Sequence, residues 1–98
     1  MKLFVSFKED NGKGFVYVCD QEIKGKKVSE GKKQIDLANS YYEWKELEEN
    51  AIIQMIKGKD AITFFGINSV SLGQKLNLLD ISNATYICGI PYCFIILK

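Results

Sequence analysis

The N-terminal part of the chain contains two short runs of β-branched and aromatic residues with an Asn-Gly pair between them. Residues 3–7 (LFVSF) and 15–19 (FVYVC) have the composition of β-strands, and Asn11-Gly12 supplies residues that tolerate positive φ angles. Tight turns between antiparallel strands require such residues. The pattern predicts a β-hairpin at the start of the fold, so the rest of the chain must pack against a sheet.

A helix is predicted between residues 40 and 57. Ser40 and Glu43 have the spacing of a capping box, in which each side chain binds the backbone amide of the other. Gly58 marks the expected C-terminal end. The apolar positions recur at helical spacing and would face a core; they are Trp44, Leu47, Ala51 and Met55, with Ile52 and Ile56 beside them.

The remaining elements complete an α+β pattern. Further strands are predicted at 34–37, 61–65, 84–88 and 92–97, the last two joined by Gly89-Ile90-Pro91. A second helix is expected from a cap at Asn68 or Ser69 to about Asn77. The predicted order is β-β-β-α-β-α-β-β, a single α+β domain over residues 1–98, with a mixed or antiparallel sheet and two helices. We expect residues 92–97 to form a core strand, because at an edge they would invite pairing with a second copy.

The charged side chains narrow the classes of function. The chain of 98 residues has a formal net charge of +1, so attraction of the whole molecule to nucleic acid is not implied. It contains no histidine and no arginine, and all 13 positive side chains are lysines. The usual acid–base group and metal ligand is therefore missing, as is the bidentate clamp for phosphate. We expect no enzymatic activity and no cofactor.

The apolar segments and the cysteines indicate the cellular compartment in which we expect the protein. No run approaches the ~20 apolar residues of a membrane span, and the apolar part of residues 1–10 is too short for a signal peptide. The three cysteines, Cys19, Cys88 and Cys93, fit a reducing compartment. We expect a cytoplasmic protein without membrane contact, a monomer or a homodimer. A disulfide between Cys88 and Cys93 remains an alternative.

Several segments together resemble the archaeal family called domain of unknown function 424. The first group of matching positions follows the second strand; it comprises Val18, Cys19, Asp20, Glu22, Gly25, Lys26, Glu30, Gly31 and Tyr42. Gly66, Leu78-Leu79-Asp80 and the C-terminal Gly89-Ile90-Pro91 are also in register. The resemblance covers nearly the whole chain. Two positions depart from it: Tyr92 stands where the family tends to have histidine, and Glu43-Trp44 where it often has two glycines.

The resemblance implies a place in translation rather than a reaction. Members of the family are uncharacterised, but many are encoded near translation components, which suggests work on the ribosome or on RNA. Because Tyr92 replaces the histidine, a shared role cannot depend on an imidazole.

The segment from Lys24 to Lys33 is the main candidate site. It carries five lysines (Lys24, Lys26, Lys27, Lys32 and Lys33) and one glutamate, which gives a local charge of 5 − 1 = +4. A basic loop of this kind can lie along phosphates and release counterions. Stacking on bases could come from nearby aromatic residues, namely Tyr17, Tyr41, Tyr42 and Trp44. The alternative is a solvated lysine-rich loop.

Other candidates have weaker signals. Asp20 and Glu22 could form half of a carboxylate pair or a metal site, although an aspartate after a strand more often caps a turn. The three cysteines with Asp20 could supply four zinc ligands, but they lack the close Cys pairs of structural zinc sites. Backbone amides at residues 66–69 could meet an anion, without the glycine pattern of a phosphate loop. Gly89, Pro91 and Tyr92 read as a rigid surface turn, with Asp20 as another possible surface position.

These observations leave three functional hypotheses. The preferred one is a non-enzymatic module of archaeal translation that contacts RNA or a ribosomal protein through the lysine segment. The second is a protein–protein adaptor that uses the acidic first helix and exposed aromatic residues. The third is a small enzyme that uses Asp20 or Glu22 with a lysine.

Overall fold

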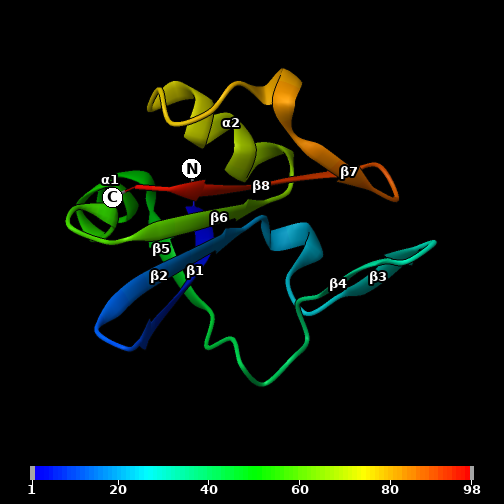
Figure 1. Ribbon diagram of the computed structural model, residues 1–98, viewed down its shortest axis with the longest axis horizontal. Helices are drawn as coiled ribbons and strands as arrows, with labels where there is room; N and C mark the ends of the chain where they lie inside the picture. Colours follow the sequence, from blue (N-terminus) through cyan, green and yellow to red (C-terminus); the bar gives the residue numbers. More distant parts are fainter. Residues whose placement is uncertain (1, 98) are drawn as a thin grey trace.

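The computed structural model describes residues 2–97 and has the predicted α+β architecture, with two helices and a mixed sheet. The main sheet has six strands in the order β5-β1-β2-β6-β8-β7 (Figure 1). These strands are β1 (Lys2–Asp10), β2 (Lys13–Cys19), β5 (Lys45–Glu48), β6 (Ala61–Phe65), β7 (Thr85–Ile87) and β8 (Ile90–Ile96). The helices are α1 (Glu49–Ile56) and α2 (Ile67–Lys75), and short 3₁₀ turns lie at Gln21–Ile23 and Ile81–Asn83. A separate pair of strands is formed by β3 (Lys27–Glu30) and β4 (Lys33–Asp36).

The predicted N-terminal hairpin is confirmed. Strands β1 and β2 pair antiparallel from Phe4 opposite Cys19 to Asp10 opposite Lys13. Asn11 and Gly12 form the turn with φ angles of 52° and 76°, the conformation for which this residue pair is suited. Strand β2 also pairs in parallel with β6, which occupies residues 61–65 as predicted.

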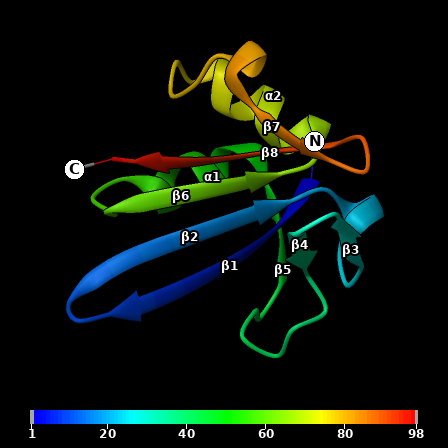
Figure 2. The same ribbon diagram turned by 45° about the vertical axis from the view of Figure 1, so that its right-hand side comes forward.

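The two faces of the sheet have different coverings. Helices α1 and α2 pack on one face, where the main core includes Val16, Ile52, Phe64 and Val70. The opposite face carries the β3–β4 pair over its end near β7 (Figure 2). There a second core forms around Cys19, Ile35, Leu37, Phe65 and Ile87. Strand side chains alternate between the faces, so each strand contributes to both cores.

The first helix is shorter than predicted. Residues 45–48 form strand β5, which pairs antiparallel with β1, and α1 begins at Glu49. The prediction of a capping box between Ser40 and Glu43 is wrong, because the backbone amide of Glu43 donates to Ser6 Oγ at 3.0 Å instead of to Ser40. Trp44 lies outside the helix, and its indole N–H donates to the Leu37 carbonyl at 3.1 Å. Pairing with distant β1 overrides the local helical pattern here.

Two predicted connections also differ. Residues 24–33 do not form a loop: most of them belong to the β3–β4 hairpin, and the predicted third strand lies in this pair rather than in the main sheet. The turn between β7 and β8 consists of Cys88 and Gly89, with φ angles of 50° and 77°. Pro91 lies within β8, opposite Tyr86.

The prediction that residues 92–97 form a core strand holds for the side chains on the helix-covered face of the sheet and is wrong for those on the opposite face. Ile95 and Leu97 pack against the main core, but the side chains of Phe94 and Ile96 are 57% and 69% exposed. Strand β7 covers the outer side of β8 only from Ile90 to Tyr92. The rest of β8 is therefore at the edge of the sheet.

Neither helix within residues 2–97 has the length and apolar character that crossing a membrane requires.

Candidate nucleic-acid interface

The lysine segment is an ordered hairpin, which we call the lysine hairpin and define as residues 24–37. Its two strands pair from Lys27 opposite Asp36 to Glu30 opposite Lys33, with Gly31 in the turn at a φ of 61°. The lysines named from the sequence (24, 26, 27, 32 and 33) are all exposed. The three ion pairs among residues 2–97 involve lysines elsewhere, Lys2, Lys8 and Lys75. The ammonium groups of the hairpin thus have no carboxylate within ion-pair distance in the described chain, and that of Lys24 lies over the Phe4 ring, 4.8 Å from its centroid.

The hairpin is attached to the main sheet at several points. Ile35 and Leu37 are buried in the second core, and the Leu37 amide donates to the Lys26 carbonyl at 2.8 Å. The Glu30 carboxylate accepts a hydrogen bond from the Cys88 amide at 2.6 Å. The Cys88 thiol donates to the Ser29 carbonyl at 3.3 Å. These contacts hold the lysines in a fixed position beside β7 and β8.

The four aromatic residues expected to assist binding form one cluster. The rings of Tyr17, Tyr41 and Tyr42 meet edge to face, with centroids 5.1–5.6 Å apart. Tyr42 stacks on Trp44 at 4.7 Å. Tyr17 and Tyr41 join their hydroxyls at 2.9 Å, and burial, followed by this hydrogen bond, raises the pKa of Tyr17. Tyr41 is the most exposed of the four, at 44%, and the Lys8 ammonium lies over one face of its ring, 5.2 Å from the centroid, so a base would have to stack on the opposite face.

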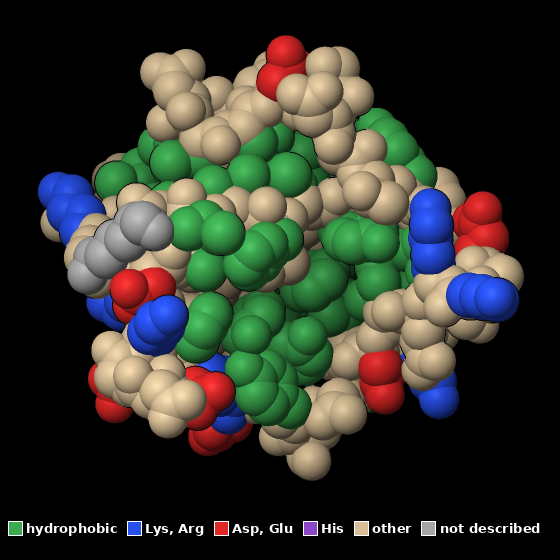
Figure 3. Space-filling model, viewed as in Figure 1, with side chains coloured by type: hydrophobic (Ala, Val, Ile, Leu, Met, Phe, Trp, Pro, Cys, Tyr) green, Lys and Arg blue, Asp and Glu red, His purple; other side chains and the backbone are tan. Residues whose placement is uncertain are grey.

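No other strand pair or helix of the described chain packs on the rest of this side of the sheet, which we call the open face. It consists of the exposed Phe94 and Ile96, the half-buried Phe15 and Thr63, and the buried Ala61 between them. The register places them together, because Phe15 is opposite Ala61 and Thr63 is opposite Phe94. Figure 3 shows a band of hydrophobic side chains across the middle of the molecule, where β2, β6 and β8 lie in Figure 1. Sequence reasoning missed this surface, because apolar residues at alternating positions of β8 gave no sign of which would be covered.

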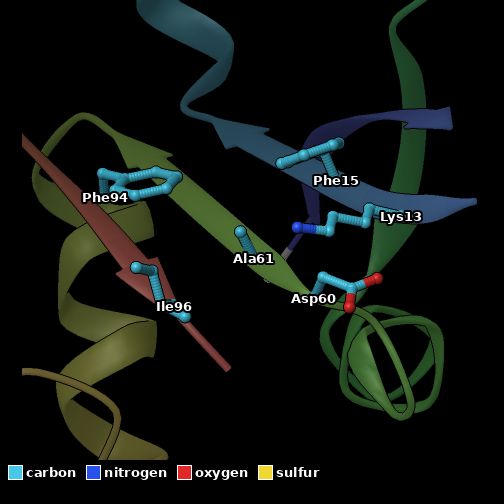
Figure 4. A pocket seen from close by; sticks show the side chains of 6 residues that line it. All are labelled: Lys13, Phe15, Asp60, Ala61, Phe94 and Ile96. Atoms are coloured by element: carbon cyan, nitrogen blue, oxygen red, sulfur yellow. The ribbon is translucent and has the colours of Figure 1, made fainter. Parts of the chain in front are cut away.

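A hollow of about 190 Å³ lies at one end of the open face, with Ala61 between Phe15 and the pair Phe94 and Ile96 (Figure 4). Lys13 and Asp60 border its polar side. One carboxylate oxygen of Asp60 accepts a hydrogen bond from the Gly14 amide at 2.7 Å.

Asp20 has a structural role, but its carboxylate caps a distant helix rather than the local turn considered from the sequence. Its carboxylate is buried and accepts hydrogen bonds from the amides of Asn68 and Ser69, at 3.0 and 2.8 Å, and from the Ser69 hydroxyl at 2.7 Å. Asp20, which directly follows β2, therefore caps the first turn of α2, and the expected caps, Asn68 and Ser69, are instead its donors. Gly66 permits this approach, because a Cβ there would lie 2.5 Å from the Asp20 carboxyl carbon.

The other positions expected on a surface turn are only partly exposed. Gly89 is exposed and Tyr92 is half-buried, but Asp20 and Pro91 are buried. The Pro91 carbonyl accepts a hydrogen bond from the Gly66 amide at 2.8 Å, so this turn braces the start of α2. Glu22 lies on an exposed 3₁₀ turn and shares no hydrogen bond with Asp20 in the described chain.

The cysteines form neither a disulfide nor a metal site. All three are free thiols; Cys19 is buried, Cys88 is exposed and Cys93 is half-buried. Burial, and then the charge of Asp20, raises the pKa of the Cys19 thiol to about 12, which keeps it protonated and unreactive at neutral pH. Within residues 2–97 no group of three or more histidine, cysteine, aspartate or glutamate side chains is placed to hold a metal ion.

Comparisons with known proteins identify a family but no activity. The model of the family described as "Protein of unknown function (DUF424)" matches residues 7–97. The crystal structure of an uncharacterized conserved protein from Methanopyrus kandleri superposes with a TM-score of 0.77 at 13% identity, covering 99% of this chain and 92% of that one. No curated protein matches the chain.

Proposed function

This chain belongs to the DUF424 family, whose function is unknown, and we propose that it is a non-enzymatic cytoplasmic module of translation that binds single-stranded RNA through the lysine hairpin. The observation that carries the proposal is the placement of five exposed lysines on an anchored hairpin beside a sheet face that bears aromatic rings. Charge and stacking surface, which single-stranded nucleic acids require together, are next to one another in this molecule.

The lysines would supply the affinity. Each ammonium group that contacts a phosphate releases condensed counterions, and this gain is independent of sequence. Because the hairpin is anchored through Ile35 and Leu37, the binding of RNA would not have to order a flexible loop. The hairpin therefore presents its charges at little entropic cost.

The aromatic residues would supply stacking. Tyr41 is exposed at the margin of the tyrosine cluster, and Phe94 is exposed on the open face. A base can stack on either ring whatever its identity, and unpaired bases are more accessible than those in a duplex. With no arginine in the chain, base edges would be read little, so we expect a preference for single strands rather than for a particular sequence.

The other two functions have less support. The acidic helix expected of an adaptor does not form, because Glu43 lies on a loop and both Glu46 and Glu48 lie on β5. Three carboxylates in that region, those of Glu43, Glu48 and Glu49, form ion pairs with Lys8, Lys2 and Lys75 respectively. For an enzyme, the Asp20 carboxylate is already occupied by three hydrogen bonds at the start of α2, and Glu22 is exposed on a 3₁₀ turn.

The test measures binding of a fluorescent single-stranded RNA by anisotropy. The variant K27Q/K32Q/K33Q removes three charges from the hairpin, and K2Q/K45Q/K57Q removes three exposed charges from elsewhere, so both variants have the same net charge. We expect the hairpin variant to bind about tenfold or more weakly and the control to bind nearly as the wild type does. Equal losses in the two variants would overturn the assignment to the hairpin.

The link to translation has its own experiment. The protein is sedimented with archaeal ribosomal subunits at low and high salt, with and without nuclease. Cosedimentation that the hairpin substitutions abolish would support a ribosomal site. Cosedimentation that survives these substitutions and high salt would favour a ribosomal protein as the partner.

A further inference from the structure

The two edges of the main sheet differ in how they are protected. Strand β5 forms one edge, and its sequence Lys45-Glu46-Leu47-Glu48 is charged at three of four positions. Charged side chains discourage pairing with another strand. The other edge consists of β7 and the segment that β7 does not cover, residues 93–96 of β8 with Leu97 directly after them, whose sequence CFIIL has no charge.

The backbone of this apolar segment has amide and carbonyl groups that no strand of the described chain pairs with. Leu97 donates its amide to Asp60, and Pro91 accepts from Gly66, so the odd-numbered residues of β8 bond to β6. In an antiparallel ladder the backbone amide and carbonyl groups of the intervening residues, Phe94 and Ile96, point away from β6, toward the open edge of the sheet. Strand β7 ends at Thr85 opposite Tyr92, and no other strand of residues 2–97 lies along this side.

The side chains of the segment suit a copy of itself. If two copies pair antiparallel about a two-fold axis at Ile95, Phe94 lies opposite Ile96 of the second copy and Cys93 lies opposite its Leu97. Every cross-strand pair is then apolar, and no charge is buried. Phe94 and Ile96, now 57% and 69% exposed, would then lie next to each other across the two-fold axis, on the open face. The formal net charge of +1 adds little repulsion between the copies.

We propose that the protein forms a symmetric homodimer by antiparallel pairing of residues 93–97, the end of β8 and Leu97, with the same residues of a second copy. The two main sheets become one, and their open faces lie side by side. A five-residue edge buries less than the ~800 Å² per partner of a standard stable interface, so the dimer forms at micromolar or higher protein concentration.

The first test is sedimentation of the RNA-free protein between about 1 and 500 μM, a range set by the small interface. We expect the mass to rise from one chain of 11.1 kDa toward two. Ile96→Lys should keep the protein monomeric without unfolding it, because this side chain is largely exposed. Ile67→Lys, at a 50% exposed position on α2, is the matched control and should dimerise as the wild type does. A monomer throughout the range, or a dimer with Ile96→Lys, would overturn the proposal.

The second test fixes the register. Ile95 faces itself across the proposed axis in a non-hydrogen-bonded pair, where Cα atoms are about 4.5 Å apart, within the range of a disulfide. Ile95→Cys in a C88S/C93S background should therefore give a disulfide-linked dimer under mild oxidation. The same background without Ile95→Cys is the control. Failure of Ile95→Cys to cross-link would contradict the proposed register.

Discussion

The two faces of the main sheet are built from the same strands but have different roles. On the helix-covered face, side chains such as Val16, Phe64 and Val70 are completely buried. On the other face, the second core lies under the lysine hairpin, and Phe94 on the open face remains exposed. The difference arises from what packs on each face rather than from the apolar character of the strands. The covered face stabilises the fold, and the partly covered face is available for binding.

The sharpest contrast between the faces is one of stability. Phe64→Ala on the covered face should lower the free energy of unfolding by about 3–5 kcal/mol, because it leaves a cavity in the core. Phe94→Ala on the open face should cost about 0.5 kcal/mol or less. Urea denaturation measures both. Similar large losses in the two variants would mean that the open face is part of a core.

The cap on α2 connects the two regions and gives the next largest effect. Asp20→Ala should cost about 1–3 kcal/mol, because it leaves buried amide and hydroxyl donors of α2 without an acceptor. Glu22→Ala, two residues away and exposed, is the matched control and should leave stability nearly unchanged. Thermal unfolding distinguishes them, and an unaffected Asp20→Ala variant would rule out a stabilising cap.

Aromatic side chains on opposite faces provide a comparison in binding. Tyr41→Ala beside the open face should weaken binding of single-stranded RNA by about 1–2 kcal/mol through lost stacking. Tyr86, exposed to a similar extent, is opposite Pro91 in the ladder and points to the other face, because its neighbour Ile87 is in the second core. Tyr86→Ala should leave affinity unchanged. If both substitutions weaken binding equally, stacking is not specific to the open face.

The second core should also respond to alkaline pH. Burial raises the pKa of Cys19 from 9.0 to about 12, so unfolded chains lose this proton at a lower pH than folded ones. Its contribution to stability is complete below pH 9 and is lost as the pH rises toward 12. At pH 10 this lowers the free energy of unfolding by about 1 kcal/mol. Cys19→Ala should make this alkaline decrease in stability smaller. A Cys19→Ala variant with the same alkaline decline would assign the effect to other groups, such as Tyr17, whose pKa is also raised.

Features encoded by neighbouring residues could be predicted, and those that depend on distant partners could not. Asn11-Gly12 specified the first hairpin locally, and the apolar run at residues 61–65 identified β6. The helical pattern after Ser40 was misleading, because pairing with β1 makes residues 45–48 a strand. The hydrogen bonds to Asp20 come from Asn68 and Ser69, which lie 48 and 49 positions further along the chain, and no local sequence pattern reveals such a contact.

The same distinction applies to the candidate site. The charge of the lysine segment was evident from the sequence, but its hairpin structure depends on the burial of Ile35 and Leu37 against the sheet. The aromatic residues were recognised individually, and only the fold brings Tyr17 and Tyr41 together. The exposure of Phe94 depends on the short length of β7, which the apolar run at residues 84–88 did not indicate.

The most direct test of the account is the salt dependence of RNA affinity for the wild type and for a variant in which all five hairpin lysines are changed to glutamine. Binding of a single-stranded RNA is measured over a series of salt concentrations, and the logarithm of affinity is plotted against that of salt. The account predicts a steep negative slope for the wild type, and a slope smaller in magnitude by up to about 3.5 for the variant, because each of five phosphate contacts to a single strand contributes about 0.7. Equal slopes and affinities for the two proteins would contradict a role for the lysine hairpin in binding RNA.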